Sequence, residues 1–124
     1  ILGRFVTYPF TSDHSLPAVT SGVCLMCGIV GYVGAQEACP FLLTGLQRLE
    51  YRGYDSAGIA TLGGNNGVQL SRAVGRIQRL SEATQKNPHR GTSGIGHTRW
   101  ATHGPATEEN AHPHLGGTGQ VVIA

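Results

Sequence analysis

Cys27 is the residue whose surroundings most clearly predict chemistry. It follows Met26, which an aminopeptidase could remove, and it begins a strand-like run from 27 to 34 in which β-branched and aromatic residues are punctuated by glycine. A cysteine at the first position of a chain carries a thiol nucleophile and a free α-amine that can take the thiol proton. One residue then supplies both nucleophile and base, so the pattern predicts nucleophilic catalysis by Cys27.

Two other interpretations of Cys27 stay open. A free cysteine is often a small buried hydrophobe without a function. Cys24 and Cys27 also form a C-x-x-C pair, but a redox pair normally opens a helix after a strand, whereas here an irregular stretch precedes a strand. A covalent mechanism also needs an oxyanion hole and groups that hold a substrate, and the segment 96–104 offers candidates.

The histidines of the second half give a competing prediction. Four of them lie between His97 and His114, and His112 and His114 have the alternate spacing that places two metal ligands on one strand face. Pro113 between them and the lack of a nearby cysteine weigh against a zinc site. A histidine-rich zinc-binding structural module, with Cys27 as inert packing, is the alternative to an enzyme.

The elements that must position these residues follow from hydrophobic periodicity. Leucines three and four apart, with Gly53 available as a C-terminal cap, predict a helix, and a loop rich in glycine and asparagine predicts a hairpin. We expect helices at 36–51 and from 77 to about 86, and strands at 27–34, 57–62, 68–74, 94–100 and 120–123. This order predicts an α+β fold with a largely antiparallel sheet.

Composition bounds the remaining classes. The 124 residues carry a formal net charge of +2, with 13% charged and 40% hydrophobic residues, which supports one modest globular domain. Charges of both signs are dispersed, so we expect no nucleic-acid or membrane partner. Three cysteines without a secretory signal favour a reducing compartment and predict a cytoplasmic protein.

Four motifs, at 26–32, 48–58, 96–104 and 110–114, carry a family resemblance. They read Met-Cys-Gly-Ile-Val-Gly-Tyr, Arg-Leu-Glu-Tyr-Arg-Gly-Tyr-Asp-Ser-Ala-Gly, Gly-His-Thr-Arg-Trp-Ala-Thr-His-Gly and Asn-Ala-His-Pro-His. In this order they resemble the class II glutamine amidotransferase domain of the glutamine:fructose-6-phosphate aminotransferases, or glucosamine-6-phosphate synthases. The resemblance implies the αββα sandwich of N-terminal-nucleophile hydrolases. Another class II amidotransferase, such as an amidophosphoribosyltransferase, is the alternative within this group.

The resemblance also implies residue roles. Cys27 matches the nucleophile, Arg52 matches a basic residue near it, and the segment that binds glutamine is matched by Arg99, Trp100, Thr102 and His103. A guanidinium fork suits an α-carboxylate, and an indole provides an apolar wall with one donor. Taken singly, Arg99 as a surface ion-pair partner, Trp100 as core packing and His103 as a loop residue are the alternatives.

The implied reaction is glutamine hydrolysis through a thioester on Cys27, with ammonia passed to fructose 6-phosphate to form glucosamine 6-phosphate. The sugar phosphate would bind an isomerase domain outside this sequence. No metal and no organic cofactor are implied. The oligomeric state of the parent protein stays open, with a homo-oligomer among the options.

Both ends of the sequence depart from the family pattern. Residues 1–26 lie outside the match, and we expect them to be upstream sequence translated in error or a propeptide cleaved after Met26, because an acylated Cys27 lacks its amine base. In the family an Asn-Gly pair that forms the oxyanion hole, and an acid that holds the substrate amine, follow a strand like 120–123. We therefore expect 27–124 to be the N-terminal part of a glutaminase domain, and the chain alone to be inactive.

Overall fold

A computed structural model describes residues 26–63 and 67–124 of the chain, with six strands and three helical segments. The expectations about residues 1–25, including Cys24, lie outside these described residues. The elements, in chain order, are β1 (Gly28–Val33), α1 (Ala38–Gln47), the 3-10 turn η1 (Glu50–Arg52), β2 (Ser56–Leu62), β3 (Val68–Val74), α2 (Ile77–Lys86), β4 (Ser93–Arg99), β5 (His114–Gly116) and β6 (Val121–Ile123).

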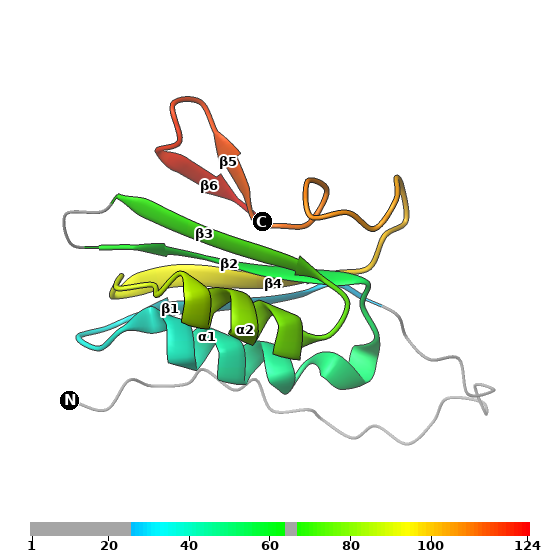
Figure 1. Cartoon of the computed structure of the whole chain (residues 1–124), viewed down its shortest axis with the longest axis horizontal. Coiled ribbons are helices and arrows are strands. Elements are labelled where there is room, and N and C mark those ends of the chain that lie inside the picture. Colours follow the sequence, from blue (N-terminus) through cyan, green and yellow to red (C-terminus); the bar gives the residue numbers. More distant parts are fainter. Residues whose placement is uncertain (1–25, 64–66) are drawn as a thin grey trace, which may run out of the picture.

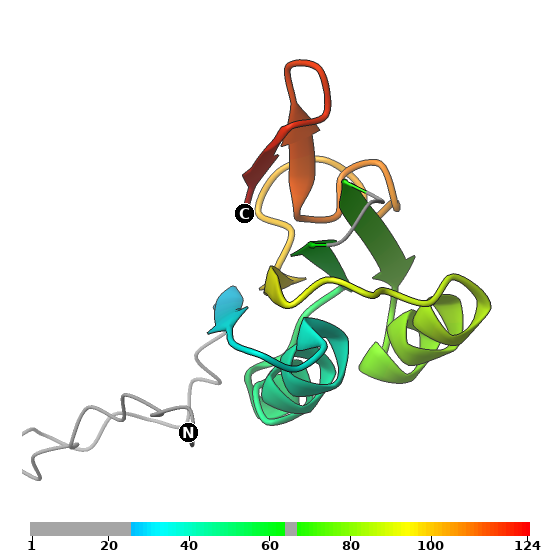
Figure 2. The same ribbon diagram turned by 90° about the vertical axis from the view of Figure 1, so that its left-hand side faces the viewer.

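The strands form two antiparallel sheets. The main sheet has the order β1-β4-β2-β3, so that β4 enters between the first two strands of the chain, and β5 pairs with β6 in a separate hairpin. Helices α1 and α2 lie side by side under one face of the main sheet, and the β5–β6 hairpin stands over the opposite face (Figures 1 and 2). The fold is thus α+β, with three successive layers of an αββα sandwich among the described residues.

The hydrophobic core lies between the helices and the main sheet. Leu42 and Leu46 of α1, Ile77 and Leu80 of α2, and Ile59 of β2 are buried side chains of this cluster. The spacing of three or four residues within each helix places its leucine and isoleucine side chains on one face. Burial of each such side chain contributes about 1.5 to 3 kcal/mol, so this face fixes both helices against the sheet.

The prediction of the β2–β3 hairpin is confirmed, and so is the helix that begins at Ile77. The single helix expected at 36–51 is wrong in its last turn, since α1 ends at Gln47 and η1 follows. Gly53 then ends η1 with a φ of 74°, a left-handed conformation that glycine adopts without strain. β5 was not predicted, because a three-residue strand ending in glycine has no readable periodicity.

Glycine at position 28 allows the start of β1 to pack closely against Leu49 and Thr98. A Cβ there would lie 2.7 Å from Leu49 Cδ1 and 2.9 Å from Thr98 Oγ1. The Gly28 amide donates to that same Thr98 hydroxyl, at 3.0 Å. In the register, Gly28 faces Thr98, so Cys27 stands just before the paired strand and beside the end of β4.

Candidate active site

Cys27 is exposed directly before β1 and contacts the backbone of Trp100. The amide nitrogen of Trp100 lies 3.4 Å from Cys27 Sγ and donates a hydrogen bond to it. The carbonyl oxygen of the same residue lies 3.9 Å from the sulfur. Pairing of β1 with β4 therefore brings a thiol from the start of the described chain against a residue 73 positions later.

Arg99 directs its guanidinium into the loop that follows β4. Nη2 donates to the carbonyl of His103 at 2.6 Å, and Nη1 lies 3.4 Å from the carbonyl of Pro105. Nη1 is also 3.7 Å from a carboxylate oxygen of Asp55, and the arginine side chain is only 12% exposed. Arg99 is therefore neither a surface ion-pair partner nor a freely extended fork, because from the end of β4 it binds carbonyls of the loop that follows.

Thr102 and His103 lie on this same loop with their side chains exposed, while Trp100 is half-buried. The glutamine-binding candidates of 99–103 are thus neighbours at and after the end of β4, and among them Trp100 contacts Cys27. Arg52 lies in η1, where its Nε donates to the Tyr51 hydroxyl at 3.1 Å and its guanidinium carbon is 5.6 Å from the Tyr51 ring centre.

Asp55 is the residue of this region that sequence reasoning missed. Its amide donates to the Arg99 carbonyl at 2.9 Å, and its carboxylate accepts the Ala101 amide and the Ser56 hydroxyl, the latter at 2.8 Å. The available signal was a single acid directly before a buried strand in a chain with seven acidic residues. A partly buried carboxylate needs hydrogen-bond donors, and here the Ala101 amide, in the loop after β4, is one of them.

Three histidine rings are in contact between the main sheet and the β5–β6 hairpin: His97 and His112 are stacked, and His114 meets His112 edge to face. The His97 and His112 ring centres are 4.6 Å apart, and those of His112 and His114 are 4.5 Å apart. Burial, with smaller electrostatic contributions from His112, Arg99 and His114, lowers the pKa of His97 to about 4. Burial also lowers the pKa of His112. Both rings are therefore neutral near pH 7.

The stacked arrangement gives no support to the zinc interpretation. Within 26–63 and 67–124, no group of three or more His, Cys, Asp or Glu side chains is arranged to hold a metal ion. The Nδ1 atoms of His97 and His112 are both buried and lack a hydrogen-bond partner. The His97 and His112 rings pack face against face, so their nitrogen atoms are not directed at a shared metal position.

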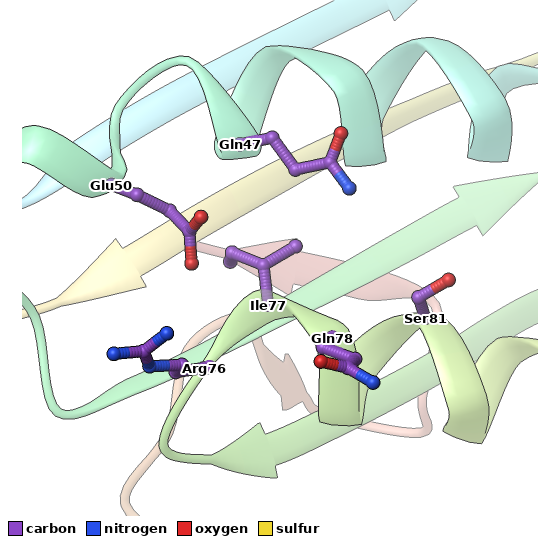
Figure 3. Close-up of a pocket in the computed structure, with 6 residues that line it drawn as sticks. All are labelled: Gln47, Glu50, Arg76, Ile77, Gln78 and Ser81. Carbon is purple, nitrogen blue, oxygen red and sulfur yellow. The ribbon is translucent and has the colours of Figure 1, made fainter.

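An open pocket of about 360 Å³ lies elsewhere, between the end of α1 and the start of α2 (Figure 3). It is on the helical side of the main sheet, and none of the candidate residues lines it. Its lining residues are Gln47, Glu50, Arg76, Ile77, Gln78 and Ser81.

No model of a protein family matches the chain. Curated sequences do: the glutamine–fructose-6-phosphate aminotransferases of Caldanaerobacter subterraneus subsp. tengcongensis and Gloeobacter violaceus are 55% and 57% identical to it, over 98 and 99 residues. That of Thermus thermophilus is 54% identical over 98 residues. The chain is homologous to part of the glutamine–fructose-6-phosphate aminotransferases. The matches cover 79% of this chain and 16% of each relative, so the chain spans about a sixth of their length.

Solved structures agree with this relationship. The glutamine phosphoribosylpyrophosphate amidotransferase of B. subtilis, in complex with ADP and GMP, is 29% identical, with a TM-score of 0.59 over 69% of this chain and 18% of its own. A protein described as the allosteric regulatory enzyme of purine biosynthesis is 31% identical, with a TM-score of 0.61 over 70% of this chain and 18% of its own. Because these identities are lower, the two solved structures are relatives in fold. The sequence comparisons favour the glutamine–fructose-6-phosphate aminotransferases over the amidophosphoribosyltransferases. In the described part of the chain, no helix has the length and apolar character needed to span a bilayer.

Proposed function

We propose that Cys27 is the nucleophile of a glutaminase site. Its sulfur attacks the side-chain amide carbon of glutamine, the carbon–nitrogen bond breaks, and ammonia leaves with the proton taken from the thiol. Water then hydrolyses the γ-glutamyl thioester, which releases glutamate and restores the thiol. The observation that carries this proposal is the exposed Cys27 sulfur beside the Trp100 amide, in a chain similar to glutamine–fructose-6-phosphate aminotransferases.

The base in this proposal is the α-amine of Cys27, which is available only when Cys27 is the first residue. We therefore propose that the active protein begins at Cys27 and that 27–124 belongs to the glutaminase domain. The sequence alignments are about as long as this segment, which supports the boundary. Residues 1–26 then have no part in the reaction.

The glutamine substrate is proposed to bind along the loop that begins beside the nucleophile. Arg99 would bind the α-carboxylate, because the longer of its two hydrogen bonds to loop carbonyls, 3.4 Å to Pro105, is the one most readily exchanged for a charged oxygen. Thr102 and His103 supply exposed hydrogen-bonding groups, and Trp100 supplies an apolar wall. Arg52, in the turn after α1, is proposed to act near the nucleophile.

Ammonia released at Cys27 is proposed to be transferred to fructose 6-phosphate, which gives glucosamine 6-phosphate, as the names of the relatives indicate. The acceptor would bind parts of the protein outside this sequence. We also propose a cytoplasmic location, which is supported by the free thiols of both described cysteines, Cys27 and Cys39.

The test uses the full-length protein that carries this sequence, with translation begun at Met26. A diazoketone analogue of glutamine should label Cys27, as located by mass spectrometry, and Cys27→Ala should abolish both labelling and glutamine hydrolysis without changing the circular dichroism spectrum. Cys39→Ala is the matched control, because Cys39 is buried in α1 away from the site. Undiminished hydrolysis by Cys27→Ala, or an adduct confined to Cys39, would overturn the proposal.

A further inference from the structure

Asp55 contacts the backbone on both sides of the residue that touches the nucleophile. Its amide donates to the Arg99 carbonyl at 2.9 Å, and its carboxylate accepts the Ala101 amide. These two atoms flank Trp100, whose own amide lies 3.4 Å from Cys27 Sγ. One residue therefore fixes the entry and the exit of the peptide unit that contacts the candidate thiol.

The same carboxylate also faces the guanidinium of Arg99. The oxygen that accepts the Ser56 hydroxyl at 2.8 Å lies 3.7 Å from Arg99 Nη1, with both charged side chains largely withdrawn from solvent. Coulomb attraction at this separation is stronger in a partly buried environment than in water. Asp55 is thus a counter-charge that acts on the Arg99 side chain together with its hydrogen bonds to the His103 and Pro105 carbonyls.

We propose that Asp55 is a positioning residue of the glutaminase site. It holds the Trp100 peptide against Cys27 and orients Arg99 for the substrate carboxylate, while touching neither the thiol nor the substrate itself. The catalytic consequence rests on the proposed function, but the effect on Cys27 does not. A positioning error on the order of 1 Å can cost about 100-fold in rate, so loss of this carboxylate should be visible in kcat.

A substitution at Asp55 should leave the fold largely intact, which makes the proposal testable. Backbone atoms of residue 55 carry two of its bonds: its amide to the Arg99 carbonyl, and its carbonyl to the Gly75 amide at 2.8 Å. Both bonds survive a change of side chain. Asparagine retains one oxygen acceptor for the Ala101 amide but not the negative charge, whereas alanine removes both.

The experiment compares Asp55→Ala and Asp55→Asn in the full-length protein, with Cys27 first. We expect Asp55→Ala to lower kcat for glutamine hydrolysis by about 10- to 100-fold and to change the rate of Cys27 alkylation by iodoacetamide at least several-fold. Asp55→Asn should restore most of kcat and of the alkylation rate, while KM for glutamine stays raised because Arg99 lacks its counter-charge. Glu37→Gln is the control, since it breaks an exposed ion pair with Arg90 at the other end of the sheet.

The outcomes separate this inference from the proposed function. A parent protein that hydrolyses no glutamine, but whose Cys27 alkylation rate still changes in Asp55→Ala and recovers in Asp55→Asn, would overturn the glutaminase proposal and support the positioning role. Wild-type kcat, KM and alkylation in Asp55→Ala, with only a lower melting temperature, would overturn the positioning role and leave Asp55 a structural residue.

Discussion

Gly58 of β2 packs directly against the backbone of His112, so that a Cβ at position 58 would collide with the His112 carbonyl oxygen. From the neighbouring strand β3, Arg72 Nη1 donates to the carbonyls of Glu109 and Ala111, both at 3.3 Å. The segment that leads into β5 is therefore held on the sheet at its backbone. This docking places the His112 ring on His97, two residues before Arg99.

Gly58→Ala should consequently detach this segment. The added methyl would also stand 2.9 Å from the Ser71 carbonyl oxygen and 2.8 Å from Arg72 Cγ, so the strand pair cannot absorb it without shifting. Overpacking of this kind costs about 1 to 3 kcal/mol in the free energy of unfolding. Chemical denaturation measures the loss, and hydrogen exchange should show faster exchange at the Ala111 amide.

Gly31→Ala is the matched control for this prediction. Gly31 lies in β1, and a Cβ there meets nothing within 4 Å. Alanine in this open position should leave the free energy of unfolding within about 0.5 kcal/mol of the parent value. Equal losses for the two substitutions would show that the close approach of Gly58 and His112 is not what matters.

The histidine stack predicts acid sensitivity. The pKa of His97 is about 4 in the folded chain and about 6.5 when unfolded, so between these values the unfolded state binds more protons. Stability is then full above about pH 6.5 and falls as the pH drops towards 4, by about 1 to 3 kcal/mol. Denaturant midpoints measured from pH 7.5 to 4 provide the check.

His97→Phe separates this contribution from the other buried histidines. A phenyl ring can still stack on His112 but takes up no proton. The acid-induced loss should become smaller in this variant, with a remainder from His89 and His112, whose pKa values are also lowered by burial. An unchanged pH profile would mean that protonation of His97 is not coupled to unfolding.

Most of the fold could be predicted from local patterns. Periodic leucines marked α1, and the apolar runs 57–62 and 68–74, joined by a glycine-rich loop, marked the hairpin, since both signals depend on near neighbours in sequence. The insertion of β4 between β1 and β2 could not be predicted, because strand order depends on pairing between residues far apart in the chain. The α1–η1 break was missed because the leucine spacing continues across it to Leu49.

The site was predicted less completely than the fold. Cys27 could be proposed as the nucleophile because its chemistry depends on its place in the sequence, and the resemblance supplied the proposed binding residues of 99–103. Asp55 was missed because its contacts are with backbone atoms of Arg99 and Ala101, more than forty residues later in the chain. The Arg99 guanidinium was proposed as a fork for an α-carboxylate, and its hydrogen bonds to the His103 and Pro105 carbonyls could not be predicted from the sequence.

Arg99→Lys should therefore have two effects in the full-length protein. The lysine ammonium replaces the planar guanidinium of Arg99, so KM for glutamine should rise. The loss of binding free energy should be about 1 to 3 kcal/mol. Lysine also cannot reproduce the paired contacts to the His103 and Pro105 carbonyls, so the loop should become more sensitive to proteolysis even without substrate. Steady-state kinetics and limited trypsin digestion measure the two effects, and an unchanged KM would remove Arg99 from the binding site.

Tyr54→Phe should weaken the connection between η1 and α2. The Tyr54 hydroxyl donates to the Glu50 carboxylate and accepts the Ile77 amide at 2.7 Å, so it satisfies the first N–H of α2. Phenylalanine leaves that amide without its partner, at a cost of about 1 to 3 kcal/mol in the free energy of unfolding. Tyr51→Phe is the control, because the Tyr51 side chain is exposed.

An alkaline titration tests the same contact independently. Burial and the Glu50 carboxylate raise the pKa of Tyr54 to about 12, compared with about 10 for an unfolded tyrosine. The folded state therefore keeps the phenol proton longer than the unfolded state does, and stability present below pH 10 is lost as the pH rises towards 12. Tyr54→Phe should show less of this alkaline loss than the parent protein. If Tyr54→Phe and the parent lost stability equally between pH 9 and 11, the Tyr54 hydroxyl would not be the group that joins η1 to α2.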